Sequence, residues 1–287
     1  MRKIGIIGGT GVEDTSIFGT LSLITVETPF GTAEGFAGKI DDTSVYFIAR
    51  HGKGHSLPPH RIPYRANIYA LKKLGVTEIL SFTAVGSLNR GLIPGTFVNT
   101  SQILDFTKSR EHTFFDGGVM PVCHVDFSFP YCPVLRERLN GILTRLGVRH
   151  SKAGCYVATE GPRYETAAEV RMYGLMGGDV AGMTQMPEAV LAREAEICYA
   201  NCSLVTNMGS GLSWTALSHE EVVAMMDENA KTIARIIHAF LTEEEQTLAS
   251  CHCREAAHAV GGFSPLIKSK EKRVQATDVL RYRDPRR

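Results

Sequence analysis

The chain has 287 residues, of which 44% are hydrophobic and 21% charged, and its formal net charge at pH 7 is +1. This composition is typical of a globular protein with one large domain or two small ones. The near-zero net charge argues against a nucleic-acid or membrane partner, both of which attract strongly basic surfaces. We see no signal peptide and no apolar run of the roughly 20 residues that span a bilayer, so we expect a cytoplasmic protein.

Short apolar runs that predict strands alternate along the chain with patterns that predict helices. The predicted strands are 4–7, 45–49, 79–83, 97–104, 155–159, 180–183 and 202–206. The predicted helices are 61–74, 133–146, 167–176, 187–199 and 219–241. This alternation predicts an α/β fold in which helices flank one central, mostly parallel or mixed sheet.

Two helix starts carry capping boxes, in which a Ser or Thr is followed three residues later by Glu. These are Thr166 with Glu169 and Ser218 with Glu221. Glu165 therefore directly precedes a helix cap, and His219 is the first residue of the longest helix. Because α/β proteins bind ligands at the ends of such elements, we expect both side chains near a site.

The helix and strand pattern stops near residue 242, which predicts a single domain over 1–242 and an appended tail of unknown role over 243–287. Five of the seven cysteines lie in or near apolar segments and are expected to pack as small hydrophobic residues. Cys251 and Cys253 lie in the polar tail, around His252. Their spacing is compatible with a chance pair, a local disulfide or a weak metal clip.

A glycine-rich segment, Gly8-Gly9-Thr10-Gly11, follows the first predicted strand. Backbone N–H groups of such a segment can converge on an anion, and the Thr10 hydroxyl adds a donor. A dinucleotide-binding Gly-x-Gly-x-x-Gly motif is not completed, because Asp14 stands where the third glycine belongs. The segment is therefore interpreted as an anion-binding loop.

Four further predicted strands end in small or polar residues. The ends are Arg50-His51-Gly52, Thr83-Ala84-Val85-Gly86-Ser87, Thr184 and Thr206-Asn207. Arginine can hold a phosphate with two parallel hydrogen bonds, and histidine can add a donor. We expect these strand ends to lie along one edge of the sheet. Their polar side chains then predict a phosphate site at that edge.

Tyr164 and Glu165 lie in the segment Thr159-Glu160-Gly161-Pro162-Arg163-Tyr164-Glu165-Thr166, which is predicted to turn from a strand into a helix. A tyrosine ring can stack on a flat heterocycle while the neighbouring carboxylate accepts a hydrogen bond from a ring N–H. A 6-oxopurine carries a proton on N1, and guanine adds a 2-amino group, whereas adenine offers only a lone pair at N1. If Glu165 faces a purine, it favours a 6-oxopurine. A solvated turn glutamate beside a packing tyrosine is the alternative reading of this pair alone.

Taken together, these segments resemble the trimeric family of purine nucleoside phosphorylases and methylthioadenosine phosphorylases. The resemblance covers roughly residues 3–241, in order, and leaves out the tail. It rests on the segments 6–11, 49–52, 83–88, 160–165, 182–184, 186–188 and 218–222. The family implies a central mixed, partly barrel-like β-sheet flanked by helices.

The resemblance also implies a role for each matching residue. Phosphate-site positions match Thr10, Arg50, His51, Thr83, Ala84 and Thr184. The position that lies against the ribose matches Met183. The positions around the base match Tyr164, Glu165, Asn207, Met208 and Gly209. Two glycines follow Asn207, which leaves the role of Gly209 open. His219 matches the position at the 5′ end of the sugar, and His124 resembles a residue that a neighbouring subunit contributes.

Three residues depart from the methylthioadenosine branch of this family. Asn207 replaces an aspartate, Glu165 replaces a small hydroxyl residue, and His219 replaces an apolar residue. An amide both accepts and donates, so Asn207 suits a protonated N7 beside the O6 of a 6-oxopurine. We therefore expect Asn207, Glu165 and His219 to be the catalytic and specificity residues of a 6-oxopurine nucleoside phosphorylase.

The predicted reaction converts inosine or guanosine and phosphate into the base and ribose 1-phosphate, in purine salvage. Phosphate is a co-substrate, no metal or organic cofactor is implied, and the expected assembly is a homotrimer or a dimer of trimers. The alternative within the family is an S-methyl-5′-thioinosine or methylthioadenosine phosphorylase. A nicotinamide-dependent oxidoreductase and a non-catalytic nucleoside-binding protein are alternatives from other classes.

Overall fold

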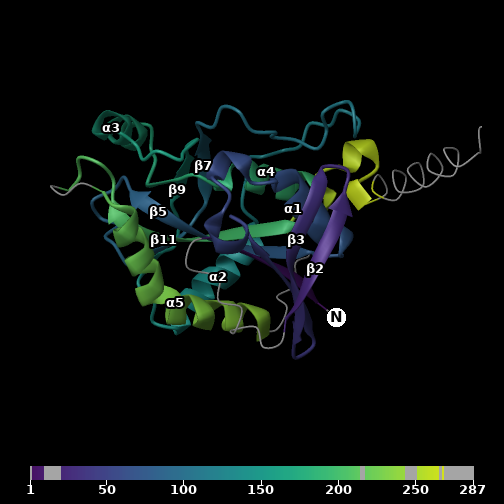
Figure 1. The fold of residues 1–287 in the computed structure, drawn as a ribbon, viewed down its shortest axis with the longest axis horizontal. Helices are drawn as coiled ribbons and strands as arrows, with labels where there is room; N and C mark the ends of the chain where they lie inside the picture. Colours follow the sequence, from purple (N-terminus) through teal and green to yellow (C-terminus); the bar gives the residue numbers. More distant parts are fainter. Residues whose placement is uncertain (1, 10–20, 214–216, 243–250, 265–266, 268–287) are drawn as a thin grey trace, which may run out of the picture.

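The computed structural model describes residues 2–9, 21–213, 217–242, 251–264 and 267, and its described strands form one sheet (Figure 1). The strands are β1 (Lys3–Gly8), β2 (Ser22–Thr28), β3 (Gly31–Ile40), β4 (Thr43–Ala49), β5 (Glu78–Ser87), β6 (Phe97–Asn99), β7 (Gln102–Asp105), β8 (His150–Ser151), β9 (Cys155–Ala158), β10 (Val180–Gly182) and β11 (Cys198–Met208). The helices are α1 (Tyr64–Lys73), α2 (Pro133–Arg145), α3 (Ala167–Leu175), α4 (Gln185–Glu194) and α5 (His219–Thr242), with short 3-10 turns at η2 (Lys53–His55), η3 (Pro59–Arg61), η5 (Cys253–Glu255) and η6 (His258–Val260).

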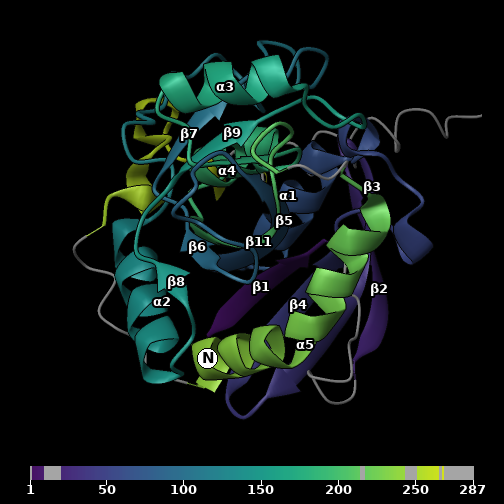
Figure 2. The ribbon, with the colours of Figure 1, turned by 90° about the vertical axis from the view of Figure 1, so that its left-hand side faces the viewer.

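β5 is the centre of the sheet, because it pairs with three strands. Its first half pairs in parallel with β1, its end pairs antiparallel with β10, and β11 runs parallel to it along its whole length. The main order is β2-β3-β4-β1-β5-β10-β9-β7, and β6 and β8 continue from β11. The branch at β5 makes the mixed sheet curl around an interior, as Figure 2 shows. The predicted fold class is confirmed.

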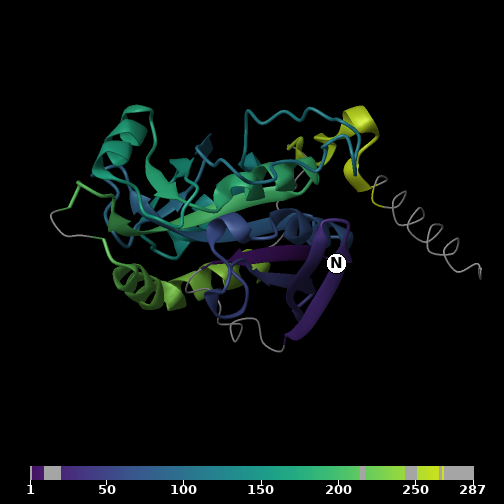
Figure 3. The same ribbon diagram turned by 45° about the horizontal axis from the view of Figure 1, so that its top comes forward.

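Helices cover both faces of the sheet, because apolar side chains alternate between the faces along each strand. Ile4 and Ile6 of β1 pack into a core shared with α2 and α5, whereas the adjacent Ile7 packs into a second core with α1 and α4. Figure 3 shows α5, in green, lying along one face of the sheet. None of the described helices is long and apolar enough to cross a membrane.

Two sequence predictions about the elements were wrong, and one hairpin was missed. The strand 97–104 is two short strands, β6 and β7, which join different neighbours. The helix 187–199 ends at Glu194 as α4, and β11 starts at Cys198. The hairpin of β2 and β3 was not predicted, because many of its side chains are exposed and its apolar alternation is weak.

The described part of the tail packs on the body of the protein. Cys253 is buried in the core that α2 and α5 share, and Ala257, Phe263 and Ile267 are buried in the core of α1 and α4. The Phe263 ring lies 5.0 Å from that of Phe114 and 6.0 Å from that of Tyr69, centroid to centroid. These residues therefore extend the hydrophobic cores beyond residue 242, and the boundary at 242 stays a prediction.

Candidate active site

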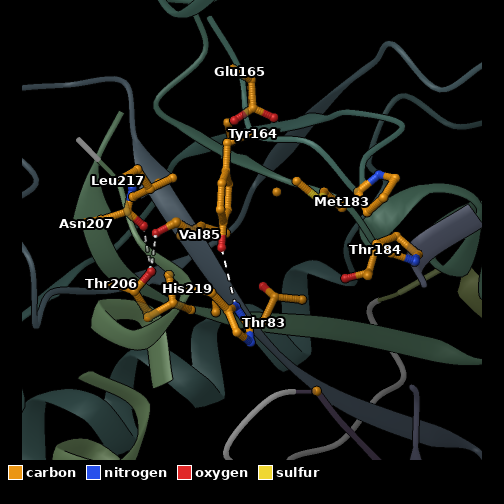
Figure 4. A pocket seen from close by; sticks show the side chains of 18 of the residues that line it. Thr83, Val85, Tyr164, Glu165, Met183, Thr184, Thr206, Asn207, Leu217 and His219 are labelled. Carbon is orange, nitrogen blue, oxygen red and sulfur yellow. Dashed lines mark hydrogen bonds between the residues drawn. The ribbon is translucent and has the colours of Figure 1, made fainter. Parts of the chain in front are cut away.

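A cavity of about 420 Å³ lies where the ends of β1, β4, β10 and β11 meet the second half of β5 (Figure 4). Most of the predicted site residues line it, although they come from distant parts of the chain. They are Arg50, His51, Thr83, Ala84, Tyr164, Glu165, Met183, Thr184, Asn207, Gly209 and His219. Met208 and His124 are not among the lining residues, and His124 is exposed. Thr10 lies outside the described residues, next to Gly9, which lines the cavity.

Arg50 is buried and held in a fixed orientation at the end of β4. Its Nε donates to Glu188 Oε2 at 2.6 Å, and its Nη2 donates to Glu188 Oε1 at 2.8 Å and to Ser81 Oγ at 2.6 Å. Its Nη1 donates to the carbonyl of Phe82 at 3.0 Å. Burial acts to lower the pKa of Arg50, but the ion pair with Glu188 more than offsets this and the pKa is raised. Within the described structure, one N–H of Nη1 is left for an anion.

His51 follows Arg50, and its ring is neutral. Burial, the Arg50 charge and His55 lower its pKa to about 4, against a smaller opposing effect of the Leu57 carbonyl. Its Nδ1 lies 2.8 Å from that carbonyl. Since a carbonyl only accepts, Nδ1 carries the proton and Nε2 is a bare acceptor. His51 is thus an acceptor at the site, and not the donor that the sequence suggested.

Two threonines, Thr83 and Thr184, also line the cavity and carry hydroxyl groups. Thr83 Oγ1 lies 2.8 Å from Ser203 Oγ and 3.3 Å from the Asn201 amide that donates to it. Thr184 immediately precedes α4, and its backbone N–H donates to the Tyr156 hydroxyl at 3.3 Å. Both threonines are buried, so a small anion between them would be shielded from solvent.

The segment that carries Glu165 is shaped by Gly161 and anchored by Thr159. Gly161 has φ +65°, and a Cβ there would lie 2.5 Å from Met183 Sδ, so only glycine fits. The Thr159 hydroxyl donates to Glu165 Oε1 at 2.7 Å. Glu165 Oε2 has no such partner among the described residues and is available to a ligand. The capping box of Thr166 and Glu169 is present, as predicted, and fixes the start of α3 directly after Glu165.

Asn207 is turned into the cavity by a bulge near the end of β11. The pairing with β5 shifts between Val205 and Asn207, which places Asn207 opposite Gly86. A Cβ at Gly86 would lie 3.1 Å from Asn207 Nδ2, so the glycine leaves room for the amide. Asn207 Oδ1 accepts from the Thr206 hydroxyl at 2.8 Å, and Nδ2 donates to the carbonyl of Met208 at 3.0 Å. One acceptor and one donor position of the amide therefore remain for a ligand.

His219 and Tyr164 meet across the cavity. Figure 4 shows the Tyr164 ring reaching from the side of Glu165 toward His219. The Tyr164 hydroxyl lies 3.4 Å from His219 Nδ1. Burial, with a smaller effect of the Glu165 charge, raises the pKa of Tyr164, so the hydroxyl keeps its proton at neutral pH. Ser218 accepts from the backbone N–H of Glu221 at 3.2 Å, which supports the predicted start of α5 beside the cavity.

Arg110 is a positioning residue that the sequence did not suggest. Its Nη1 donates to the carbonyls of Met183 at 2.7 Å and Met186 at 2.5 Å, and its Nη2 donates to those of Thr159 at 3.2 Å and Glu160 at 2.8 Å. It therefore ties the segment before Glu165 to the segment that carries Thr184. Its sequence neighbourhood gives no signal, because its partners are backbone carbonyls of remote segments.

A second unpredicted group of lining residues is the segment after His51. His55 stacks on His51 with ring centroids 4.1 Å apart, and it lies 6.2 Å from His219. Ser56, Leu57, Pro58 and Pro59 line the same side. A second histidine four residues after His51 could have indicated that this segment lines the site. Its glycine-rich surroundings predicted only a loop.

Comparisons with known proteins identify the family. Residues 3–242 match the family model described as the phosphorylase superfamily, so the chain belongs to that superfamily of enzymes. A curated relative named 6-oxopurine nucleoside phosphorylase, from Pyrococcus furiosus, is 48% identical over 91% of this chain and 100% of its own length. A relative named probable S-methyl-5′-thioinosine phosphorylase, from Methanothermobacter thermautotrophicus, is 47% identical over 88% of each chain.

Solved structures agree with this assignment. Methylthioadenosine phosphorylase from an antarctic soil metagenomic library has a TM-score of 0.79 and 36% identity, covering 90% of this chain and 91% of its own. A mutant adenosine/methylthioadenosine phosphorylase from Schistosoma mansoni, in complex with adenine, has a TM-score of 0.78 and 32% identity over 87% of this chain and 94% of its own. The prediction of a nucleoside phosphorylase is therefore confirmed at the level of the family.

Proposed function

We propose that this enzyme cleaves 6-oxopurine nucleosides with phosphate, releasing hypoxanthine or guanine and ribose 1-phosphate. The observation that carries the proposal is that Glu165 and Asn207 line one cavity, each with hydrogen-bonding capacity left for a ligand. The relatives named 6-oxopurine nucleoside phosphorylases support it.

The phosphate would lie near Arg50, Thr83 and Thr184. A phosphate oxygen forms the new bond to C1′ while the bond from C1′ to N9 breaks, and the bonding electrons pass to the purine. Glu188 already balances the charge of Arg50, so fixed hydrogen-bond donors, more than net charge, hold the anion. Hydrogen phosphate carries one P–OH, which can donate to the bare Nε2 of His51.

The purine would lie against Tyr164, with its edges read by Glu165 and Asn207. Glu165 accepts from N1–H and, in guanine, from the 2-amino group. Asn207 Oδ1 accepts from a protonated N7 and Nδ2 donates to O6, which stabilises the base as it departs. This chemistry requires no metal or organic cofactor, and phosphate is the co-substrate.

We also propose the assembly and location that the sequence suggested. His124 is exposed and lies between Val122 and Phe129, each 64% exposed, which supports an interface between subunits in a homotrimer or a dimer of trimers. None of the seven cysteines forms a disulfide, which suits the reducing cytoplasm.

Mixing subunits tests whether His124 acts in a neighbouring site. His124→Ala and Asn207→Ala chains are each expected to have low activity. If His124 acts in trans, co-expressed chains form hybrid assemblies with some complete sites and regain activity. A strictly additive activity of the two chains would contradict this part of the proposal.

A second candidate is phosphorolysis of S-methyl-5′-thioinosine. Leu217 and Val222 line the cavity on either side of His219, and apolar side chains there could receive a methylthio group. The Methanothermobacter relative supports this candidate.

Steady-state kinetics on guanosine, inosine, adenosine and their 5′-methylthio analogues, each with saturating phosphate, test both candidates. The proposal expects the highest kcat/KM for guanosine or inosine. A clear preference for adenosine or methylthioadenosine would overturn the roles of Glu165 and Asn207. A preference for methylthioinosine would keep those roles and favour the second candidate.

A further inference from the structure

Four cysteines from three separate segments meet in one cluster at the end of the sheet remote from the active-site cavity. Cys132 immediately precedes α2, Cys198 begins β11, and Cys251 and Cys253 come from the tail. Their Sγ atoms all lie within 4.8 Å of one another. Cys132, Cys198 and Cys253 are buried, and Cys251 is half-buried. We call this set the thiol cluster.

The spacing of the thiol cluster fits one tetrahedral metal ion. Zinc–thiolate bonds of about 2.3 Å in a tetrahedron separate the sulfur atoms by about 3.8 Å. The Sγ atoms of Cys198 and Cys251 are 3.6 Å apart. In two disulfides, the sulfur atoms of each pair would lie about 2.05 Å apart. Here all four sulfur atoms lie close together and none is bonded to another. Only a small inward adjustment would complete a coordination sphere.

The ligand set points to zinc in a structural role. Soft thiolate ligands select zinc over hard cations such as magnesium. Four protein ligands complete a tetrahedron and leave no position for water or substrate, which is the pattern of structural rather than catalytic zinc.

Two cations lie near the cluster, Arg193 beside Cys253 and Lys72 beside Cys198. They can balance part of the negative charge of a tetrathiolate.

We propose that Cys132, Cys198, Cys251 and Cys253 bind one zinc ion, which fastens the tail to the body of the enzyme. Binding converts four thiols into thiolates and releases their protons to solvent. A bound zinc would link the start of α2, the start of β11 and the tail, because their cysteines lie together. For Cys251 and Cys253 the sequence left open a chance pair, a local disulfide or a weak metal clip, and it treated Cys132 and Cys198 as packing residues.

Metal analysis of the full-length protein, purified without chelator, tests the proposal. The expected result is one zinc per chain by inductively coupled plasma mass spectrometry. Cys251→Ser should lower the zinc content severalfold, because it removes the most accessible ligand. The matched control is Cys155→Ser, a half-buried cysteine outside the cluster, which should keep the full zinc content. Equal zinc content in the two variants would overturn the proposal.

Two measurements on the unmodified chain keep the test independent of how the variants fold. Cobalt exchanged into the protein should give the sulfur-to-cobalt charge-transfer band and the visible bands of a tetrahedral thiolate site. Alkylation in denaturant with chelator and without reductant should label all seven cysteines. Unlabelled cysteines would indicate disulfides, and full labelling without bound metal would indicate free thiols. Either result would overturn the proposal.

The zinc is expected to act on stability and not on the reaction. Chelation should lower Tm and increase proteolysis of the tail, while kcat/KM for guanosine at moderate temperature stays unchanged. A loss of activity in proportion to zinc, with Tm unchanged, would contradict the structural role.

Discussion

The hydroxyl of Tyr164 lies 3.4 Å from Nδ1 of His219, so the residue proposed to lie against the base is in contact with the residue proposed to bind the sugar. The sequence suggested three independent selectors, which read the N1 edge, the N7 and O6 edge, and the 5′ end of the sugar. The contact joins the residues for the N1 edge to the residue for the 5′ end of the sugar. A change at one end of the nucleoside is therefore expected to alter binding at the other end.

Tyr164→Phe tests this coupling, because it keeps the ring against the base and removes only the hydroxyl. A neutral hydrogen bond contributes about 1 kcal/mol, so we expect an approximately fivefold change in the ratio of kcat/KM for guanosine over 5′-deoxyguanosine. The ratio for guanosine over adenosine should stay constant. If both ratios are unchanged, the hydroxyl does not orient His219.

Glu165→Ala should reduce activity most on guanosine, which would lose two hydrogen bonds. Bonds to a charged partner contribute roughly 1.5–3 kcal/mol, which corresponds to at least a tenfold loss of kcat/KM. Thr159→Val is the matched control, because it removes the hydroxyl that holds Glu165 Oε1 and leaves the carboxylate in place. Its loss should be smaller. An unchanged guanosine-to-adenosine ratio in Glu165→Ala would contradict the assigned role.

Asn207→Asp should raise activity on adenosine relative to guanosine, because a carboxylate accepts from both N7–H and the 6-amino group. The variant should also lose absolute activity. Its second oxygen would face the carbonyl of Met208, to which the Asn207 amide now donates at 3.0 Å. Kinetics on the two nucleosides separate the effects, since the carbonyl contact is the same for both. A fall in the relative rate on adenosine would refute this reading of Asn207.

Arg110→Ala should reduce kcat strongly, because four carbonyls of the site segments lose their donor. Leaving buried carbonyls unpaired costs about 1–3 kcal/mol each, so Tm should fall as well. Added guanidinium should restore part of kcat if the role is positioning. Arg136→Ala is the control, because Arg136 also donates to two carbonyls, of Thr100 and Lys152, away from the cavity. It should affect stability alone and show no rescue.

Glu194 should make stability fall with rising pH. Burial raises its pKa from 4.5 to about 7, against the opposing hydrogen bonds from Thr113 and Phe114. Between these values the folded chain keeps a proton that the unfolded chain has released, so stability falls through this window and the loss is complete above pH 7. The loss is about 3 kcal/mol at most.

The neutral His51 has the opposite effect, because its pKa is lowered from 6.5 to about 4. Its contribution to stability is therefore lost as pH falls through that window. Glu194→Gln removes the first effect and leaves the second, so the variant should gain stability from pH 4 to pH 6.5 more steeply than the parent. Urea unfolding at pH 4.5, 6 and 8 measures this. Parallel pH profiles for the two proteins would exclude a titrating Glu194.

The sequence predicted the site better than it predicted the elements around it. Strand ends such as Arg50-His51 and Thr206-Asn207 were recognisable, because polar residues directly follow apolar runs. The end of α4 was not, since buried residues continue without interruption into β11 and periodicity alone does not distinguish a buried strand from a helix.

Interactions between remote segments were the part that the sequence could not supply. Arg110 acts on backbone carbonyls, which any residue carries. The proton position of His51 depends on one carbonyl, that of Leu57. The thiol cluster joins Cys132 and Cys198 to a tail whose path no local pattern defines.

β11 begins at Cys198 in the thiol cluster and ends at Met208, next to Asn207 in the cavity. Its 11 residues span roughly 33 Å at about 3.3 Å per residue. Even through protein with an effective dielectric constant of about 20, each pair of unit charges at that distance interacts by only about 0.5 kcal/mol. A metal bound in the proposed site would therefore change the affinity for an anion in the cavity only slightly.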